Sequence, residues 1–477
     1  MKRTILIYLA LLAFFGAGIC FAIKQGQHLA APTVENAPAV GAVVPLRPDD
    51  STSLWSSLGA NLQEPLSRLL LQVIVIVLAT RLVGTLFTRW GQPSVVGEVL
   101  AGILLGPSLL GWLWPSAAGF IFPVASLGVL KLLSQIGVCL FMFVVGLELE
   151  ISHLRQKAHT VVLVSHVGIL FPYFLGVVTA LFLYSKFGAS GSSFTAFALF
   201  MGIAMSITAF PVLAHILKER GLARTFLGST ALTCAAVNDA TAWAILAFVV
   251  AIARATSLTA TAFGLGLVVV FVAVMLLVVR PQLPRWLAVG RMEAAGPSRG
   301  VMAAVLLLIL TSALATELIG IHALVGAFVA GVVMPPKTEF REYLIVRLEN
   351  FSSLFLLPLF FAYSGLRTHV GLLNDPTSWL ICLAIIGVAT LGKLGGTMVT
   401  ARLTGMNWND SFALGALMNT RGLVELVALN IGYDLGILPP RIFAMMVVMA
   451  LVTTFLTGPL LNLVERAKRR AAKASAG

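Results

Sequence analysis

The sequence predicts an all-α membrane protein that crosses the bilayer about thirteen times. Hydrophobic residues make up 59% of the 477-residue chain and charged residues only 11%, which leaves too little polar surface for a water-soluble globule of this size. Apolar segments of about 20 residues, long enough to cross a hydrocarbon core of roughly 30 Å, recur along most of the chain. Three motifs also occur twice in the same order, which predicts two related halves.

The N-terminal region has two possible interpretations, a signal peptide or an extra N-terminal transmembrane helix. A basic start precedes an apolar run that ends in Cys20-Phe21-Ala22, which resembles a cleavage site. The following stretch is rich in Ala, Pro, Ser and Gly, a composition typical of an exposed, irregular linker. The predicted divisions are 1–23 (signal peptide or helix), 24–65 (exported flexible linker), 66–465 (transmembrane domain) and 466–477 (basic cytoplasmic tail).

Thirteen spans follow from the apolar runs. They are predicted at 66–88, 93–114, 129–150, 159–184, 193–217, 225–252, 259–280, 300–317, 319–336, 351–367, 376–400, 411–432 and 441–464. Lys and Arg gather in every second loop, and such loops are cytoplasmic in most membrane proteins. This pattern places the C-terminus in the cytoplasm and residues 24–65 outside. The net charge of +13 therefore reflects topology, and we expect no nucleic-acid binding.

The internal repeat joins segments from the two halves of the chain. The matching pairs are Val95–Pro107 with Leu324–Pro336, Leu140–Leu147 with Leu359–Leu366, and, more weakly, Ala198–Thr208 with Ser411–Arg421. Matching spans are seven apart, an odd number, so the two halves have opposite topology. Inverted repeats around a site near the membrane midplane are typical of secondary transporters.

Two spans carry signals of a broken helix. Thr208-Ala209-Phe210-Pro211 lies inside the fifth span, where proline would leave backbone carbonyls unpaired and create two half-helix ends. The related stretch in the twelfth span is Asn419-Thr420-Arg421-Gly422, in which Gly422 offers a permissive backbone in place of proline. Such breaks form cation sites in transporters. A simple proline kink between packed helices is the structural alternative.

Asp239 is the central acidic residue of the predicted membrane domain. It lies near the middle of the sixth span, after Asn238 and among small residues that leave room for an ion or a neighbouring helix. A charged side chain at this depth costs roughly 2.5 to 3.5 kcal/mol on insertion scales, so such an acid is interpreted as part of an ion or proton path. One carboxylate can hold either a proton or a cation. The alternative is a structural aspartate in a permanent ion pair.

Three further charged residues lie inside predicted spans: Lys393 in the eleventh, and Arg421 and Glu425 in the twelfth. Arg421 and Glu425 are four residues apart and share a helix face. The two cations could partner Asp239 or Glu425, or occupy the charge of the breaks; a structural Arg421–Glu425 salt bridge is an equal alternative. Other charged residues lie nearer span ends, where snorkelling explains them; these are Arg81, Glu98, Lys131, Glu148 and Glu317.

Six stretches resemble signature motifs of the monovalent cation:proton antiporter superfamily, in the branch with bacterial Na⁺(K⁺)/H⁺ antiporters and plant and fungal cation/H⁺ exchangers. They are PSVVGEVLAGILLGPSLLG, GVCLFMFVVGLELE, SITAFPVLAHIL, AAVNDATAW, LPLFFAYSGL and LMNTRGLVELVALNIG, and the resemblance covers about 65–465. It implies two inverted six-helix repeats joined by a linker helix, two crossed broken helices, a homodimer and no cofactor. It also implies cation/proton exchange at Asp239, with Asn238 and Thr208 beside it and Lys393 as the core lysine.

Two departures from the wider family refine this expectation. Members with two adjacent acids tend to be electrogenic, whereas Asn238-Asp239 resembles the electroneutral subgroup; a titrating Lys393 would add a second proton. Potassium-efflux members carry a nucleotide-binding domain after the membrane part, and no GxGxxG or βαβ pattern follows here. We therefore expect no nucleotide or glutathione gating through such a domain.

Three competing functional classes fit the residues less well. An intramembrane aspartyl protease needs two acids that share a proton, whereas Asp375, Asp410 and Asp434 fall in or beside loops, so we expect no enzyme. A cation channel or a potassium-efflux-type transporter also remains possible, although the chain lacks a filter sequence such as TVGYG. We expect a multi-pass protein of the inner (cytoplasmic) membrane that moves Na⁺ or K⁺ against H⁺, with the choice of cation left open.

Overall fold

The computed structural model describes residues 2–27, 61–62, 64–148, 158–189, 191–222, 225–254, 258–287, 297–336 and 338–476. These ranges contain helices and no strand, which confirms the predicted all-α class. Most of the predicted linker at 24–65 lies outside the described residues.

The described residues form a series of helices along the chain. In chain order they are α1 (Lys2–Gly26), α3 (Pro65–Arg89), α4 (Ser94–Leu105), α5 (Leu110–Leu113), α6 (Pro115–Ile121), α7 (Leu127–Glu148), α8 (Ala158–Phe187), α9 (Phe194–Ser206), α10 (Phe210–Glu219), α11 (Phe226–Arg254), α12 (Leu258–Val274), α13 (Arg280–Trp286), α14 (Arg299–Ile319), α15 (Ala323–Val332), α16 (Thr338–Phe351), α17 (Leu357–Leu366), α18 (Pro376–Thr390), α19 (Gly396–Leu403), α20 (Trp408–Met418), α21 (Leu423–Asp434) and α22 (Pro440–Ala476). Single π-helical turns join α12 to α13, α16 to α17 and α18 to α19.

In the described part of the chain, 12 helical stretches are long and apolar enough to cross a membrane, and the bent pair α20 and α21 brings the number to 13. That number includes α1, and it omits the predicted span at 319–336. The helix there, α15, has only 10 residues because the chain leaves α14 at Gly320, whose φ of 93° ends the helix. Each of the thirteen predicted spans therefore has a helical counterpart, but the ninth is short.

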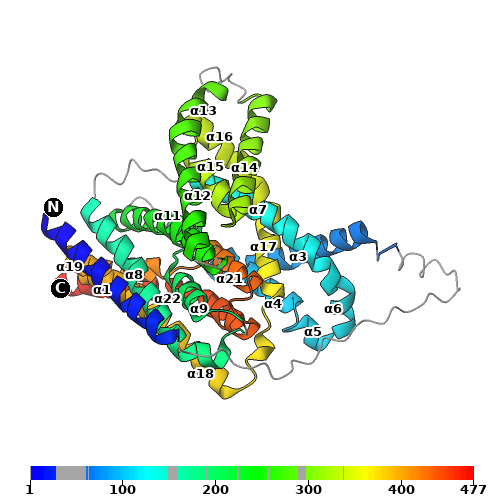
Figure 1. Cartoon of the computed structure of the whole chain (residues 1–477). Coiled ribbons are helices and arrows are strands. Elements are labelled where there is room, and N and C mark those ends of the chain that lie inside the picture. The colour runs from blue at the N-terminus through cyan, green and yellow to red at the C-terminus, as the bar shows by residue number, and fades with distance from the viewer. Residues whose placement is uncertain are drawn as a thin grey trace.

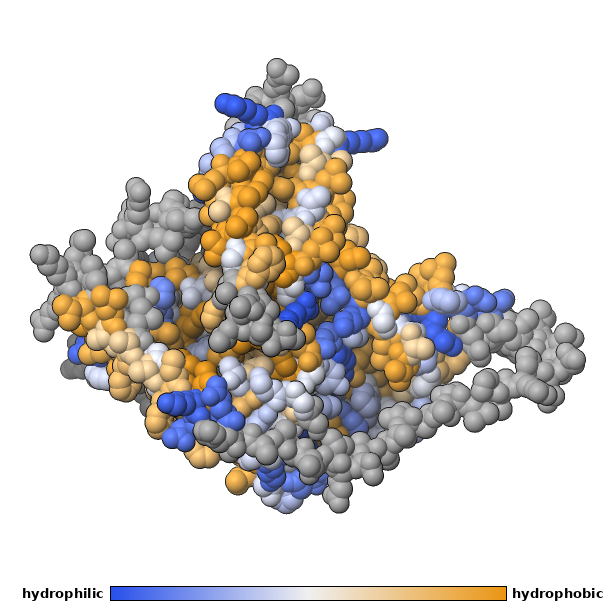
Figure 2. All heavy atoms as spheres, in the orientation of Figure 1, coloured by the Kyte–Doolittle hydropathy of each residue, from blue (hydrophilic) through white to orange (hydrophobic). Residues whose placement is uncertain are grey.

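The helices form two visibly different parts (Figure 1). α8, α9, α11 and α22 lie together with the broken helices, while α12, α13, α14 and α16 rise away from them. Apolar side chains cover much of the outer surface of both parts (Figure 2), as expected for a protein solvated by lipid. In the rising part, α13 contains Arg280 and Arg285, and α14 begins at Arg299.

Four glycines show how the inverted repeats pack. A Cβ on Gly102 of α4 would overlap the backbone of α17, and one on Gly365 of α17 would overlap the backbone of α4. The repeat-related glycines, Gly331 of α15 and Gly146 of α7, approach each other's helices in the same way. Small residues permit such close helix contacts in membranes. Each half thus packs one helix against the other half, which confirms the predicted repeat.

The two ends of the chain are both helical where they are described. α1 packs along α8, with the ring of Phe15 5.7 Å from those of Phe171 and Phe174. At the other end, α22 continues to Ala476, so the main chain of residues 466–476 in the predicted tail extends the last span as a helix.

Candidate functional site

The first break lies where the sequence predicts it. α9 ends at Ser206 and α10 begins at Phe210, so the chain leaves the helix for three residues. Pro211 is the second residue of α10, a position where the missing N–H costs nothing because first-turn amides have no partner within the helix. The proline therefore starts the second half-helix.

The second break crosses the first. α20 ends at Met418 and α21 begins at Leu423, with a 42° bend between them. The backbone N–H of Ala209 donates to the carbonyl of Thr420 at 3.0 Å, and the hydroxyl of Thr208 donates to the carbonyl of Met418 at 2.8 Å. The interrupted segments of two spans from different repeats thus bond directly to each other.

Gly422 is required at this crossing for a reason that the sequence did not reveal. Its φ of 169° is extended, so any residue can adopt it. A Cβ at this position would lie 2.8 Å from Cγ2 of Val212 and 3.1 Å from Cβ of Ala209. The close approach of α10, and not backbone freedom, excludes a side chain here.

Two buried cations occupy the C-terminal end of α9. Arg421 donates from Nη1 to the carbonyl of Ala204 at 2.7 Å and from Nη2 to that of Met205 at 2.8 Å. Lys393, in the π-helical turn between α18 and α19, donates from Nζ to the carbonyl of Ser206. These carbonyls have no partner within the helix and carry the negative end of its dipole.

Lys393 also bridges to a second helix, donating to the carbonyl of Gly168 on α8 at 2.7 Å. Several roles are predicted for the two cations. Their hydrogen bonds match one of them, which is to offset the negative charge of the carbonyls at a helix break. The consequence is that the carbonyls at the end of α9 already have donors. Oxygens elsewhere in the crossing that accept no hydrogen bond are therefore more available as ligands for a transported cation.

Asp239 is such a source of oxygen. It projects from α11, is 1% exposed, and neither carboxylate oxygen has a hydrogen-bond partner of normal geometry among the described residues. The positive groups that act on it are the N–H of Phe210, in the first turn of α10, and the charge of Lys393. A buried, ionised carboxylate without a partner is unstable. Asp239 is therefore suited to hold a proton or a cation.

Asn238 connects Asp239 to the first break. Its Oδ1 accepts a hydrogen bond from the backbone N–H of Thr208 at 3.0 Å, while its Nδ2 has no partner in the described ranges. The structure thus brings Thr208, Asn238 and the broken segment together, as the sequence predicts. In the facing break, both side-chain polar atoms of Asn419 are buried and have no hydrogen-bond partner within the same ranges. The sequence signal for this residue was its position in the repeat-related stretch, two residues before Arg421.

Arg421 and Glu425 form the predicted pair one helical turn apart. Arg421 Nη1 lies 3.4 Å from Glu425 Oε2, and both side chains have no exposed surface. The carboxylate oxygens of Glu425 have no hydrogen-bond partner in the described part of the chain.

Thr454 of α22 holds the main chain of the second break. Its hydroxyl accepts from the N–H of Arg421 at 2.9 Å and donates to the carbonyl of Arg421 at 3.0 Å.

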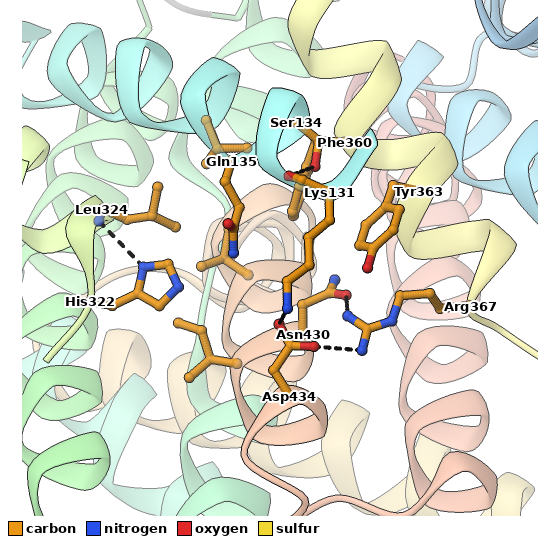
Figure 3. Close-up of a pocket in the computed structure, with 13 residues that line it drawn as sticks. Lys131, Ser134, Gln135, His322, Leu324, Phe360, Tyr363, Arg367, Asn430 and Asp434 are labelled. Atoms are coloured by element: carbon orange, nitrogen blue, oxygen red, sulfur yellow. Dashed lines mark hydrogen bonds and ion pairs between the residues drawn. The ribbon is translucent and has the colours of Figure 1, made fainter. Parts of the chain in front are cut away.

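A second polar cluster lies at the far end of α21 (Figure 3), and the sequence did not predict it. Asp434 Oδ2 lies 2.9 Å from Lys131 Nζ, and Asp434 Oδ1 lies 2.5 Å from Arg367 Nη2. Arg367 also donates to Oδ1 of Asn430 at 2.9 Å, and Asn430 donates to Ser364 Oγ at 2.8 Å. We call these five residues the distal cluster. Lys131, for which snorkelling is predicted, is 32% exposed and also pairs its ammonium with Asp434.

Comparisons with known proteins agree with this architecture. The family model described as "Sodium/hydrogen exchanger, transmembrane" matches residues 74–464. The Na⁺/H⁺ antiporter NhaS4 of Synechocystis is 44% identical over 82% of this chain and 96% of its own length. K⁺/H⁺ antiporter 1 of Saccharomyces cerevisiae is 32% identical over 85% of this chain and 47% of its own length, so the chain spans about half of that relative.

The fold also matches a solved structure. The sodium proton antiporter MjNhaP1 from Methanocaldococcus jannaschii superposes with a TM-score of 0.60, covering 85% of this chain and 99% of that one at 15% identity. A likeness at this identity establishes the fold. With the family model covering most of the chain and the Synechocystis relative covered almost completely, the chain belongs to the sodium/hydrogen exchanger family.

Proposed function

We propose that this protein is an antiporter that exchanges a monovalent cation for a proton at Asp239. The observation that carries the proposal is a buried carboxylate whose oxygens have no hydrogen-bond partner of normal geometry among the described residues, placed where two broken helices cross. Such a group is stable only when it is neutralised. Proton and cation then compete for one carboxylate, and alternating exposure of that carboxylate to the two sides couples their movements.

The neighbouring residues shape this exchange without covalent chemistry, so we propose no enzymatic activity. Asn238 and Thr208 join the carboxylate to the first break and supply side-chain oxygens near it. Lys393 and Arg421 are held by the carbonyls of α9 and contribute fixed positive charge. The crossing is formed by Ala209, Phe210, Pro211 and Gly422. The carboxylate of Glu425 offsets the positive charge of Arg421, which lies 3.4 Å away.

The stoichiometry that this arrangement supports is one cation for one proton. Asn238 cannot titrate, and both Lys393 and Arg421 are engaged by backbone carbonyls. If both cations keep their charge, the site carries the same charge whether Asp239 holds a proton or an alkali cation. The exchange is then electroneutral.

Several properties follow from family membership and the charge pattern. Relatives named for Na⁺ and for K⁺ make both ions candidate substrates. The Lys and Arg distribution supports a cytoplasmic C-terminus and an exported segment at 24–65, with the protein in the inner (cytoplasmic) membrane. A homodimer is proposed from the family resemblance.

The decisive variant is Asp239→Asn, which keeps the side-chain shape and removes the group that binds either ion. Proton flux in sealed vesicles is recorded while Na⁺ or K⁺ is added. We expect flux with the parent protein and none with Asp239→Asn. Asp375→Asn is the matched control, because Asp375 caps α18 in a connection far from the crossing in sequence and is expected to leave exchange intact. Cation-driven proton flux in the Asp239→Asn variant would refute the proposal.

A further inference from the structure

The distal cluster lies at one common side of the helix bundle. Lys131 is near the start of α7, Arg367 follows the end of α17, and Asp434 ends α21. His322, immediately before α15, lines the same small cavity (Figure 3). Residues from four distant parts of the chain therefore meet at one end of the bundle, opposite the end where Arg341 bonds to the carbonyls of Leu147 and Met334.

α21 connects this cluster to the crossing. Asp434, Asn430 and Val427 line the cavity from successive turns of α21. The helix begins beside Gly422 at the second break, and 12 residues at 1.5 Å each place the distal cluster about 18 Å from it. Of the three α21 residues that line the cavity, apolar Val427 is the one nearest the break along the helix.

The cluster also joins two differently packed parts of the molecule. α21 packs on α9, where a Cβ on Gly432 would lie 2.8 Å from the ring of Phe200, and its N-terminal break is tied to α22 through Thr454. α7 and α17 pack instead on α15 and α4 through the glycine contacts of the inverted repeat. Asp434 and Asn430 come from the first part, and Lys131 and Arg367 from the second.

The bonds across this boundary suit a contact that opens and closes. The paired side chains are partly exposed, at 32% for Lys131, 23% for Asp434 and 13% for Arg367. Ion pairs with this exposure each contribute little net stability. Arg367 is further held by the rings of Tyr433 and Tyr363, 4.2 and 5.3 Å from its guanidinium carbon.

We propose that the distal cluster is a gate that closes the path from this side of the membrane to Asp239. In the present conformation Asp434 is bonded to Lys131 and Arg367, and buried, apolar Val427 lines the cavity on the side toward the break. Movement of α21 away from α7 and α17 would break both ion pairs and open the path along α21. The inference rests on the proposed function, because a gate needs a transport site to serve.

The first test measures access to the cavity without measuring transport. In a Cys20→Ser background, which removes the exposed cysteine among four free ones, Val427→Cys is labelled with a membrane-impermeant thiol reagent added from the Asp434 side. Asp434→Asn is expected to speed labelling roughly tenfold, equivalent to a shift of about 1.4 kcal/mol in the opening equilibrium. Ala428→Cys, the adjacent buried residue absent from the cavity lining, is the matched control.

An increase at Val427→Cys alone supports the gate. An unchanged rate, or an equal increase at Ala428→Cys, overturns it, because the second result indicates general loosening of α21. Since labelling does not depend on exchange, a failure of the proposed function remains distinguishable.

The second test locks the gate. Lys131→Cys with Asp434→Cys is linked by a short bifunctional thiol reagent with a reducible spacer, and exchange is expected to stop and to return after reduction. Arg220→Cys with Glu465→Cys is the control pair, because this ion pair of 3.7 Å lies at the far end of α22 and joins elements on one side of the boundary. Full exchange by completely linked distal pairs would contradict the proposal.

Discussion

Asp239 and Asp434 are two acids in the same bundle with opposite surroundings. Asp434 is partly exposed and has two cationic partners, at 2.9 and 2.5 Å. Asp239 is buried, and neither of its oxygens has a hydrogen-bond partner of normal geometry in the part of the chain that the structure describes. A partnered acid is stable as it stands, whereas an unpartnered buried acid needs a proton or a cation. The comparison teaches that the lack of a hydrogen-bond partner, and not charge alone, distinguishes Asp239 as the proposed transport site.

The largest expected difference comes from neutralising each acid. In the vesicle assay, Asp239→Asn is expected to lose exchange completely, because no other described side chain in the crossing is both acidic and unpaired. Asp434→Asn is expected to retain exchange, with a rate altered by less than about tenfold, since loss of exposed ion pairs costs roughly 0.2 to 1 kcal/mol each. Equal losses in the two variants would remove the distinction between the acids.

Arg421 sharpens the comparison, because Glu425 is, like Asp239, a buried acid, and its charge is paired with Arg421. Arg421→Met removes two hydrogen bonds to α9 and leaves Glu425 buried without its cation. We expect about 3 to 5 kcal/mol loss in the free energy of unfolding, measured by denaturation in mild detergent. Adding Glu425→Gln should recover part of this loss. If the double variant is no more stable than the single one, the ion pair does not neutralise Glu425.

Gly422 tests whether the crossing must be tightly packed. Gly422→Ala places a Cβ 2.8 Å from Val212 Cγ2, and overpacking of this kind costs about 1 to 3 kcal/mol. The loss should shrink when Val212→Ala is added. Gly395→Ala is the matched control, because a Cβ there meets no atom within 4 Å. Equal effects of the two alanines, measured by thermal unfolding, would show that close approach at Gly422 is unimportant.

The smallest expected effect is that of membrane voltage. One net charge moved per cycle would be worth about 2.3 kcal/mol per 100 mV, whereas exchange of one cation for one proton moves none. With Na⁺ as substrate and potential set by a potassium ionophore, the endpoint of exchange is expected not to shift. An endpoint that follows voltage would indicate a second proton, with Lys393 the first residue to substitute.

The sequence predicts features whose cause is local. Length and apolarity mark the spans, Pro211 marks the first break, and the cost of burying charge singles out Asp239. The short α15 is not predicted, because Ile321 keeps the segment apolar while Gly320 and His322 interrupt the helix.

The sequence does not predict which residues far apart in the chain bond to each other in the folded protein. Arg421 bonds to Ala204 across 217 residues, and Lys393 bonds to Ser206 across 187. Which carbonyl each cation meets depends on the relative positions of packed helices, which no local pattern encodes. The distal cluster was missed for the same reason, since Lys131 and Arg367 reach Asp434 from different helices.

The most direct test of exchange at Asp239 is proton release from the purified protein when a cation binds. Na⁺ or K⁺ is titrated into detergent-solubilised protein in weakly buffered solution, and pH and cation binding are recorded together. We expect about one proton released per cation bound, because both compete for the carboxylate of Asp239, and neither event in Asp239→Asn. Cation binding without proton release, or proton release that persists in Asp239→Asn, would contradict exchange at a single unpartnered aspartate.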